Sequence, residues 1–187
     1  MVKERKCGRI KKNTQKANNI FASKRNFVYL QCKKHFTIMT IQVNGQQVEA
    51  YDLLMKKEFA LEILSGKKRV EFRSFTDHYI SRFMDKEVMK RNKAKGNPTI
   101  DELSEEIRTD IEYIHFHNYN NSWYLDVAIE SIGYCCLDSQ DIVPLAEDFD
   151  DFKAYIEDAK KYDKMPFDER PMMFYIVLAE VVDTNLQ

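Results

Sequence analysis

Gly66-Lys67-Lys68-Arg69-Val70-Glu71-Phe72-Arg73 is the stretch that decides the fold, because it predicts a helix that ends at glycine and a strand that follows. Successive side chains of a strand point to opposite faces, so Arg69, Glu71 and Arg73 share one face and Val70 and Phe72 the other. Guanidinium groups bind phosphate and carboxylate in a fixed fork geometry, so the charged face suits a polar anionic or nucleotide-like ligand. The alternative is an edge strand kept soluble by salt bridges. The residues alone do not separate the two interpretations.

The residues before this stretch predict a strand and then a helix. Tyr51-Asp52-Leu53-Leu54-Met55 is strand-like, and residues 56–65 carry apolar side chains at helical spacing. Gly66 fits the left-handed residue that ends such a helix. The carbonyl end of the helix is also a favourable place for Lys67 and Lys68, which gives both lysines a structural interpretation beside the functional one.

The pattern Gly66-x-Lys68-x-x-Glu71-x-Arg73, after this strand and helix, resembles the signature of the ASCH domain family. The motif resemblance covers residues 51–73, and beyond them it is one of element order and a closing strand. It implies an α+β fold with a PUA-like β-barrel and flanking helices. It also implies binding of RNA or a modified nucleoside in a cleft beside the motif, and some members of the family are small hydrolases or nucleases.

The resemblance and the residue chemistry together define the expected ligand site. We expect Arg73 to hold a phosphate or carbonyl oxygen, Glu71 to accept from a donor edge, and Gly66 to permit close backbone approach. Lys68, desolvated and beside arginines, is a candidate base. The structural alternative pairs Glu71 with Lys68 or an arginine in a buried salt bridge.

A hydrolase is the second hypothesis, and Lys68 and Glu71 are its candidate catalytic residues. Amidohydrolases of this fold that act on an acetylated cytidine place a threonine nucleophile three residues after a lysine, with a glutamate from another strand. Here Lys68 matches the lysine, but position 71 is glutamate, which removes that nucleophile. Glu130, or less well Asp126, would stand for the distant glutamate. An enzyme of this kind, on an acylated nucleoside or as a ribonuclease, would be metal-independent, with a water activated by Glu71.

A polar turn after residue 117 carries further candidates. His115 and His117 share a strand face, where they could ligate a metal or serve acid–base chemistry, but no carboxylate or cysteine is obviously placed to complete a metal site. We therefore interpret them as partly exposed imidazoles and expect no metal. Trp123, with Tyr119 and Tyr124, forms an aromatic cluster that could stack on a base, or else pack the end of a hairpin. Trp123 and Glu130 complete the expected ligand-binding set.

Charge is distributed unevenly along the 187 residues, whose net charge is −1. Residues 1–38 carry eleven Lys or Arg and one acid, whereas the rest carries 18 Lys or Arg and 29 acids. An acidic domain over residues 39–187 argues against a generic polyanion binder, so any RNA contact must be local. The first 38 residues are a basic leader with three interpretations: a disordered arm that touches RNA, a solvated tail, or an upstream start with Met39 as the true first residue. We favour the last.

The remaining composition narrows the class of protein. The four cysteines lack zinc-site spacing, and five glycines give no dinucleotide fingerprint, so no cofactor is expected. The absence of a long apolar run or a secretory signal predicts a cytoplasmic protein without a membrane partner. A third hypothesis is a non-catalytic module that contacts a protein partner through its acidic surface.

The other expected elements follow from periodicity and turn residues. A Gly96-Asn97-Pro98 break and a capping box from Thr99 to Glu102 divide a helical insertion over about residues 74–110, whose first helix spans 74–94. Strands are expected over 111–117, 124–133 and 172–182, and a helix over 148–162.

Overall fold

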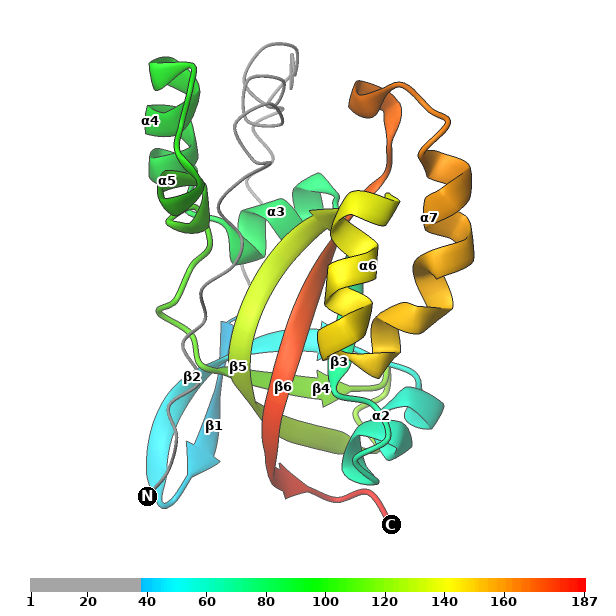
Figure 1. The fold of residues 1–187 in the computed structure, drawn as a ribbon. Helices are drawn as coiled ribbons and strands as arrows, with labels where there is room; N and C mark the ends of the chain where they lie inside the picture. The colour runs from blue at the N-terminus through cyan, green and yellow to red at the C-terminus, as the bar shows by residue number, and fades with distance from the viewer. Residues whose placement is uncertain (1–37) are drawn as a thin grey trace, which may run out of the picture. The chain divides into compact units, whose positions relative to one another are not determined.

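The computed structural model describes residues 38–187, which divide into two units: residues 85–106, and residues 38–84 with 107–187 (Figure 1). The leader interpretation of residues 1–38 therefore falls almost entirely outside the described residues, apart from Ile38, which opens a strand. Among the described residues, no helix has the length and apolar character needed to cross a membrane.

The larger unit is built on one six-stranded mixed sheet. Only the β2–β4 pair is parallel among its described strand pairs. In spatial order the strands are β1 (Ile38–Val43), β2 (Gln46–Leu54), β4 (Tyr113–His117), β5 (Tyr124–Cys136), β6 (Met172–Thr184) and β3 (Val70–Ser74). The expected α+β class is confirmed.

The sheet is not closed into the expected barrel, because β1 and β3 stand at its two ends without pairing to each other. The described β1–β2 pairing runs to Ile38 and Tyr51, so among residues 38–187 no strand pairs with the last residues of β2 on that side. Arginine side chains reach their carbonyl oxygens instead: Arg82 Nη1 donates to Asp52 (2.5 Å) and Arg73 Nη2 to Leu54 (3.1 Å). Side chains thus connect edges that a barrel would join through backbone hydrogen bonds.

The two longest strands bend along the sheet (Figure 1). Their pairing shifts register between Asp126 and Val127 and twice more before Ser131. Such irregularities increase local twist and re-aim side chains, so simple alternation fails in this part of β5.

The helix before the motif strand forms as expected. It is α2 (Lys57–Leu64), with Ala60 and Ile63 buried, and Gly66 follows it at φ +73°. The backbone N–H groups of Lys67 and Lys68 both donate to the carbonyl of Glu62, at 2.9 and 3.1 Å. Gly66 therefore ends the helix in the left-handed conformation and turns the chain into β3.

The single helix expected over residues 74–94 is wrong, since two helices occupy this range. They are α3 (Asp77–Phe83) and α4 (Lys86–Lys95). Met84 between them is buried and extended, and the Asp85 side chain accepts from the N–H groups of Glu87 and Val88. An N-cap of this kind starts a new helix.

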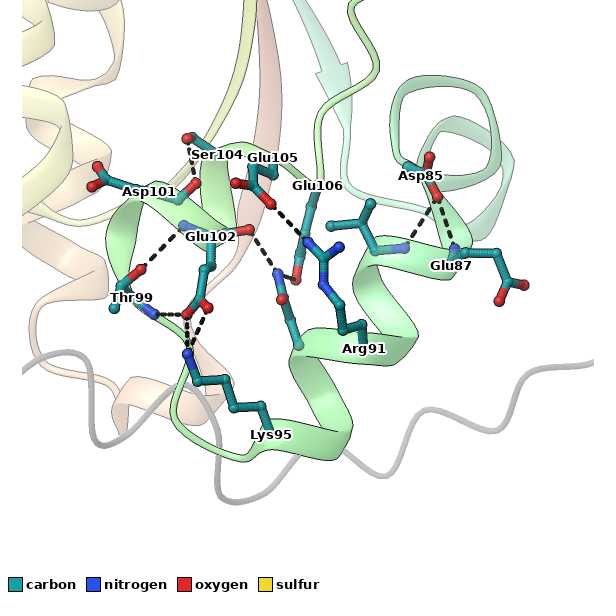
Figure 2. A network of polar contacts seen from close by, with 12 residues as sticks. Asp85, Glu87, Arg91, Lys95, Thr99, Asp101, Glu102, Ser104, Glu105 and Glu106 are labelled. Carbon is teal, nitrogen blue, oxygen red and sulfur yellow. Dashed lines mark hydrogen bonds and ion pairs between the residues drawn. The ribbon is translucent and has the colours of Figure 1, made fainter.

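The smaller unit, residues 85–106, pairs α4 with α5 (Ile100–Ser104) through polar contacts (Figure 2). The expected capping box is present: Glu102 N–H donates to Thr99 Oγ1, and Thr99 N–H donates to Glu102 Oε2. Glu102 also binds Lys95, and Arg91 binds Glu105 at 2.7 Å. Ion pairs and caps, more than apolar burial, therefore hold these two short helices together.

The helix expected over residues 148–162 is two elements, the 3₁₀ segment η1 (Asp150–Tyr155) and α7 (Ile156–Tyr162). The helix before them, α6 (Ser139–Asp148), was not expected, and the extended residue Phe149 separates it from η1. A second 3₁₀ turn, η2 (Phe167–Glu169), precedes β6. Side chains from these helices form one core cluster with the motif strand; it contains Val70, Cys135, Ile142, Ala146, Phe152, Ala159 and Met173.

Gly133 provides a direct test of the β5–β6 packing. A Cβ at this position would lie 2.3 Å from Cζ of Tyr175, its partner across the two strands. The Tyr175 ring also packs edge-on against Phe152 at 5.4 Å, so it cannot move freely. We expect Gly133→Ala to lower the free energy of unfolding by about 1–3 kcal/mol in urea denaturation followed by circular dichroism.

The matched control places Gly133→Ala in a Tyr175→Ala background. There the added methyl group meets no ring, so its destabilising effect should largely disappear. An equal effect in both backgrounds would show that the ring contact is not the cause.

Lys95 tests the electrostatics of the smaller unit. Its ammonium lies 2.5 and 2.7 Å from the Glu102 oxygens, and this hydrogen bond, followed by that from the Thr99 N–H, lowers the pKa of Glu102 to about 2. The folded pKa is depressed, so the stabilisation is complete above the unfolded pKa of about 4.3 and is lost as pH falls through about 2. Lys95→Met should raise the pKa of Glu102 toward that unfolded value in a carboxyl ¹³C NMR titration.

Lys90→Met is the control for this titration. Lys90 pairs with Glu87, at 3.3 Å, on the same helix and leaves Glu102 untouched. If the pKa of Glu102 stays near 2 in Lys95→Met, the carboxylate is held by other groups.

Candidate functional site

The motif strand β3 lies at one end of the sheet, paired antiparallel with β6. Its apolar residues face the helical core: Val70 is fully buried, and the Phe72 ring packs against Phe152 and Tyr155, at 5.0 and 4.9 Å. The intervening Glu71 and Arg73 contact each other instead. The predicted alternation of side chains is therefore present from Val70 to Arg73.

Glu71 is the centre of a buried ionic cluster. It is 6% exposed, and its two oxygens are shared between two cations: Oε1 lies 2.9 Å from Arg73 Nη2, and Oε2 lies 3.4 Å from Lys68 Nζ. All three side chains are mostly buried. They do not form the solvent-facing charged strand that was one alternative.

The Arg73 guanidinium contacts three residues, and one of its N–H groups has no acceptor among the described residues. Besides Glu71, its Nη2 donates to the Leu54 carbonyl, and Nη1 donates to Tyr79 Oη at 3.4 Å. The guanidinium carbon lies 5.7 Å from the centre of the Tyr79 ring. Its Nε, although buried, has no hydrogen-bond partner among the described residues. A buried donor without a partner is costly, so this N–H is a place where a ligand acceptor would be stabilised.

Lys68 lies between two aromatic rings. Its ammonium is 5.4 Å from the centre of the Phe59 ring and 5.3 Å from that of Phe72. Aromatic faces stabilise a cation without neutralising it. Lys68 is thus held by α2 on one side and β3 on the other, in addition to its contact with Glu71.

Burial dominates the electrostatics of Glu71. Desolvation raises the pKa of its carboxyl above the usual value, and Arg73 and Lys68 offset only part of this rise. Burial and the nearby Glu71 charge also raise the pKa of Tyr155. A carboxyl with a raised pKa beside an ammonium can accept or donate a proton or a hydrogen bond, which suits both ligand recognition and acid–base chemistry.

A line of aromatic contacts runs from the cluster into the core. Arg73 lies on Tyr79, Tyr79 stacks on Phe83 at 5.8 Å, and Phe83 meets Tyr51 edge-on at 5.1 Å. Tyr51 Oη is buried and, like Arg73 Nε, has no hydrogen-bond partner among the residues that the structure describes. Burial raises the pKa of Tyr51 to about 12, so the hydroxyl keeps its proton.

Two residues expected at the ligand site, Glu130 and Trp123, lie in other surroundings. Glu130 and Arg69 form a pair at 3.5 Å in which both side chains are more than half exposed, so Glu130 contacts an arginine outside the buried cluster. Trp123 is 6% exposed and offers no open ring face to a base. Gly66 ends α2, as described above. The exposed aromatic residue of the polar turn is Tyr119, at 92%.

The carboxylate partners of the two histidines were not predicted from the sequence. His115 Nδ1 lies 2.5 Å from Asp126 Oδ1, and His117 Nε2 lies 2.7 Å from Asp52 Oδ1. The imidazoles are 15% and 14% exposed, in keeping with the expectation of partly exposed rings. The missing information was the parallel pairing of β2 with β4, which brings Asp52 beside β4.

Metal and thiol chemistry find little support in the described part of the chain. No group of three or more His, Cys, Asp or Glu residues there is arranged to hold a metal ion. Cys135 and Cys136 are free and buried, and burial raises the pKa of both thiols. They are therefore poor nucleophiles.

Comparison with known proteins gives one weak structural likeness. No family model matches the chain, and no curated protein matches it. A mutant of the ZmASCH protein from Zymomonas mobilis, solved as a crystal structure, aligns over 69% of this chain and 66% of its own, just under two thirds. The sequence identity is 14% and the TM-score 0.34, values too low to establish a shared family.

The raised pKa of Glu71 has a consequence for stability. A carboxyl whose folded pKa exceeds its unfolded value, about 4.3, makes the folded state less stable as pH rises between the two values. Glu71→Gln removes this titration. We therefore expect the stability of Glu71→Gln, relative to wild type, to improve as pH rises from about 4 to 7 in urea denaturation series.

A relative stability that falls over the same pH range would contradict this expectation. It would mean that Arg73 and Lys68 together hold the pKa of Glu71 below its usual value. Glu130→Gln, at an exposed carboxylate, is the matched control and should show little change with pH.

Proposed function

We propose that this protein binds RNA or a modified nucleoside with the cluster of Lys68, Glu71 and Arg73. The observation that carries the proposal is the buried Arg73 guanidinium, which shares one carboxylate with Lys68 and has an Nε without a partner among the described residues. Within the cluster, two cations face one carboxylate, so a positive charge remains even when Glu71 is ionised. A ligand with an electronegative oxygen would balance it.

Each side chain of the cluster has a distinct role in this proposal. Arg73 holds a phosphate or carbonyl oxygen, because its planar fork can donate to two acceptors at once. Glu71 accepts from an amino group of the ligand. Phe59, which is 42% exposed beside Lys68, offers a ring face near the same point.

The charge of the chain favours a small ligand or a short local contact over a long polyanion. The residues from 39 onward carry an excess of acids, so they do not provide many phosphate contacts. One phosphate contact to a single strand gives a slope of log K against log salt of about −0.7, against much steeper slopes for polyanion binders. A modified cytidine without a phosphate should bind with almost no salt dependence.

The test is a titration of the full chain with short single-stranded RNA and with modified cytidines, followed by fluorescence or calorimetry. We expect Arg73→Lys to weaken binding at least about tenfold, because lysine keeps the charge but loses the fork and the Nε donor. Arg69→Lys is the matched control: it changes an exposed arginine of the same motif and should leave affinity within about twofold.

Equal losses in both variants would indicate a general charge effect and contradict a buried site. Unchanged affinity in a folded Arg73→Lys variant, with its stability checked by urea denaturation, would refute the role of Arg73. If none of the probes binds saturably, the cluster is a structural ion network only. That result would favour the third hypothesis, a non-catalytic module that contacts a protein partner.

A second candidate function is hydrolysis of an acylated nucleoside or of RNA, which the raised pKa of Glu71 and its 3.4 Å contact with Lys68 support. Here Glu71 takes a proton from the attacking water. Product analysis in the same titrations tests it: product formation that stops in Glu71→Gln supports an enzyme. Turnover that survives Glu71→Gln excludes this role of the carboxylate.

A further inference from the structure

Two histidine–carboxylate pairs lie on three neighbouring strands, none of which is the motif strand. β4 carries His115 and His117, β2 carries Asp52 and β5 carries Asp126, and in the strand register Asp52 and Asp126 flank His115 on either side. The His115 ring stacks on His117 and on Tyr124, with both centroid distances 5.5 Å. Strand pairing and stacking thus fix the position of the His115 ring.

Asp126 fixes the tautomer of His115. The carboxylate is buried, at 4% exposure, and its hydrogen bond to His115 Nδ1 is 2.5 Å long. A carboxylate only accepts hydrogen bonds, so Nδ1 must carry the proton. In the neutral ring this leaves the lone pair on Nε2, the arrangement that general bases use.

Both ring nitrogens of His117 have polar partners. Its Nε2 binds Asp52, and its Nδ1 lies 2.9 Å from the Asn118 carbonyl and also contacts Asn121. His117 therefore ties the turn after β4 to β2. Of the two rings, only His115 has a nitrogen without a hydrogen-bond partner among the described residues, its Nε2.

The charges around His115 restrict the substrate. Asp52 and Asp126 lie on the flanking strands, and Asp183 accepts a hydrogen bond from Tyr124, the residue stacked on His115. That hydrogen bond to Asp183 is the largest cause that raises the pKa of Tyr124, which keeps its proton. Three carboxylates repel an anionic phosphoryl group but not an uncharged acyl group.

We propose that His115, oriented by Asp126, is a general base that hydrolyses uncharged carboxylic esters. His115 Nε2 removes a proton from water as the water oxygen bonds to the carbonyl carbon, and the C=O electron pair moves to oxygen. When the tetrahedral intermediate collapses, the C–O bond to the alcohol breaks and His115 returns the proton to the leaving alkoxide. The products are an acid and an alcohol, and no further reactant is needed.

This activity is independent of the proposed ligand binding, because it uses other strands and other residues. Its test uses the full chain with p-nitrophenyl acetate as an uncharged ester and p-nitrophenyl phosphate as an anionic one. The reference is free imidazole at the same concentration. We expect steady-state turnover of the acetate beyond one product per chain, faster than imidazole, and no turnover of the phosphate.

His115→Gln should lower this turnover by about 10²-fold or more, whereas His78→Gln, a histidine of α3 outside the cluster, should leave it unchanged. Asp126→Asn should lower kcat with little change in KM, because Asp126 positions the ring without touching substrate. It should also shift the proton of His115 away from Nδ1 in a ¹⁵N NMR spectrum, a readout that does not depend on turnover.

Several results would overturn the proposal. They are turnover no faster than imidazole, equal rates in folded His115→Gln and wild type, release that stops at one product per chain, and hydrolysis of the phosphate in place of the acetate. A wild-type ¹⁵N spectrum with the His115 proton on Nε2 would also refute it, because the base would then be blocked.

Discussion

The hydrogen bond from Arg73 to the Leu54 carbonyl is the contact on which the rest of the arrangement depends. β3 ends the sheet on one side, and the last residues of β2, next to the strand at the other end, are not paired with the described part of β1. Among residues 38–187 no backbone pairing joins β3 to β2, and one guanidinium bridges them. Because the bridge is a buried cation, it needs a counter-charge, and Glu71 provides it two residues earlier on the same strand.

In the proposed function, the same side chains serve both stability and ligand recognition. A buried ion pair contributes little net stability over an apolar substitute, but breaking it leaves an uncompensated charge. Lys68 adds a second cation that Glu71 alone does not neutralise. The cluster therefore contributes little to stability alone. In the proposed function, a cation of the cluster exchanges its contact with Glu71 for one with a ligand oxygen.

Local signals in the sequence predicted the local structure well. Three local features were predicted correctly: the end of α2 at Gly66, the alternation along β3 and the capping box from Thr99 to Glu102. Each depends only on residues within a few positions of one another. The open sheet and the carboxylate partners of His115 and His117 were not predicted, and the burial of Glu71 was predicted only as the structural alternative. These features depend on which strands become neighbours, and no residue pattern in β2 predicts its parallel pairing with β4. Asp126 and Glu130 lie in different surroundings on β5, whose pairing with β6 is irregular between them.

The pairing of β3 with β6 has a consequence for how the protein is made. Arg73 lies opposite Phe174, roughly a hundred residues later in the chain, so the motif strand lacks this sheet partner until β6 has left the ribosome. Contacts between such distant segments form slowly, because their loop-closure entropy is paid before they gain stability. The cluster therefore cannot take its final arrangement on the sheet before residues 172–184 are available to pair with β3.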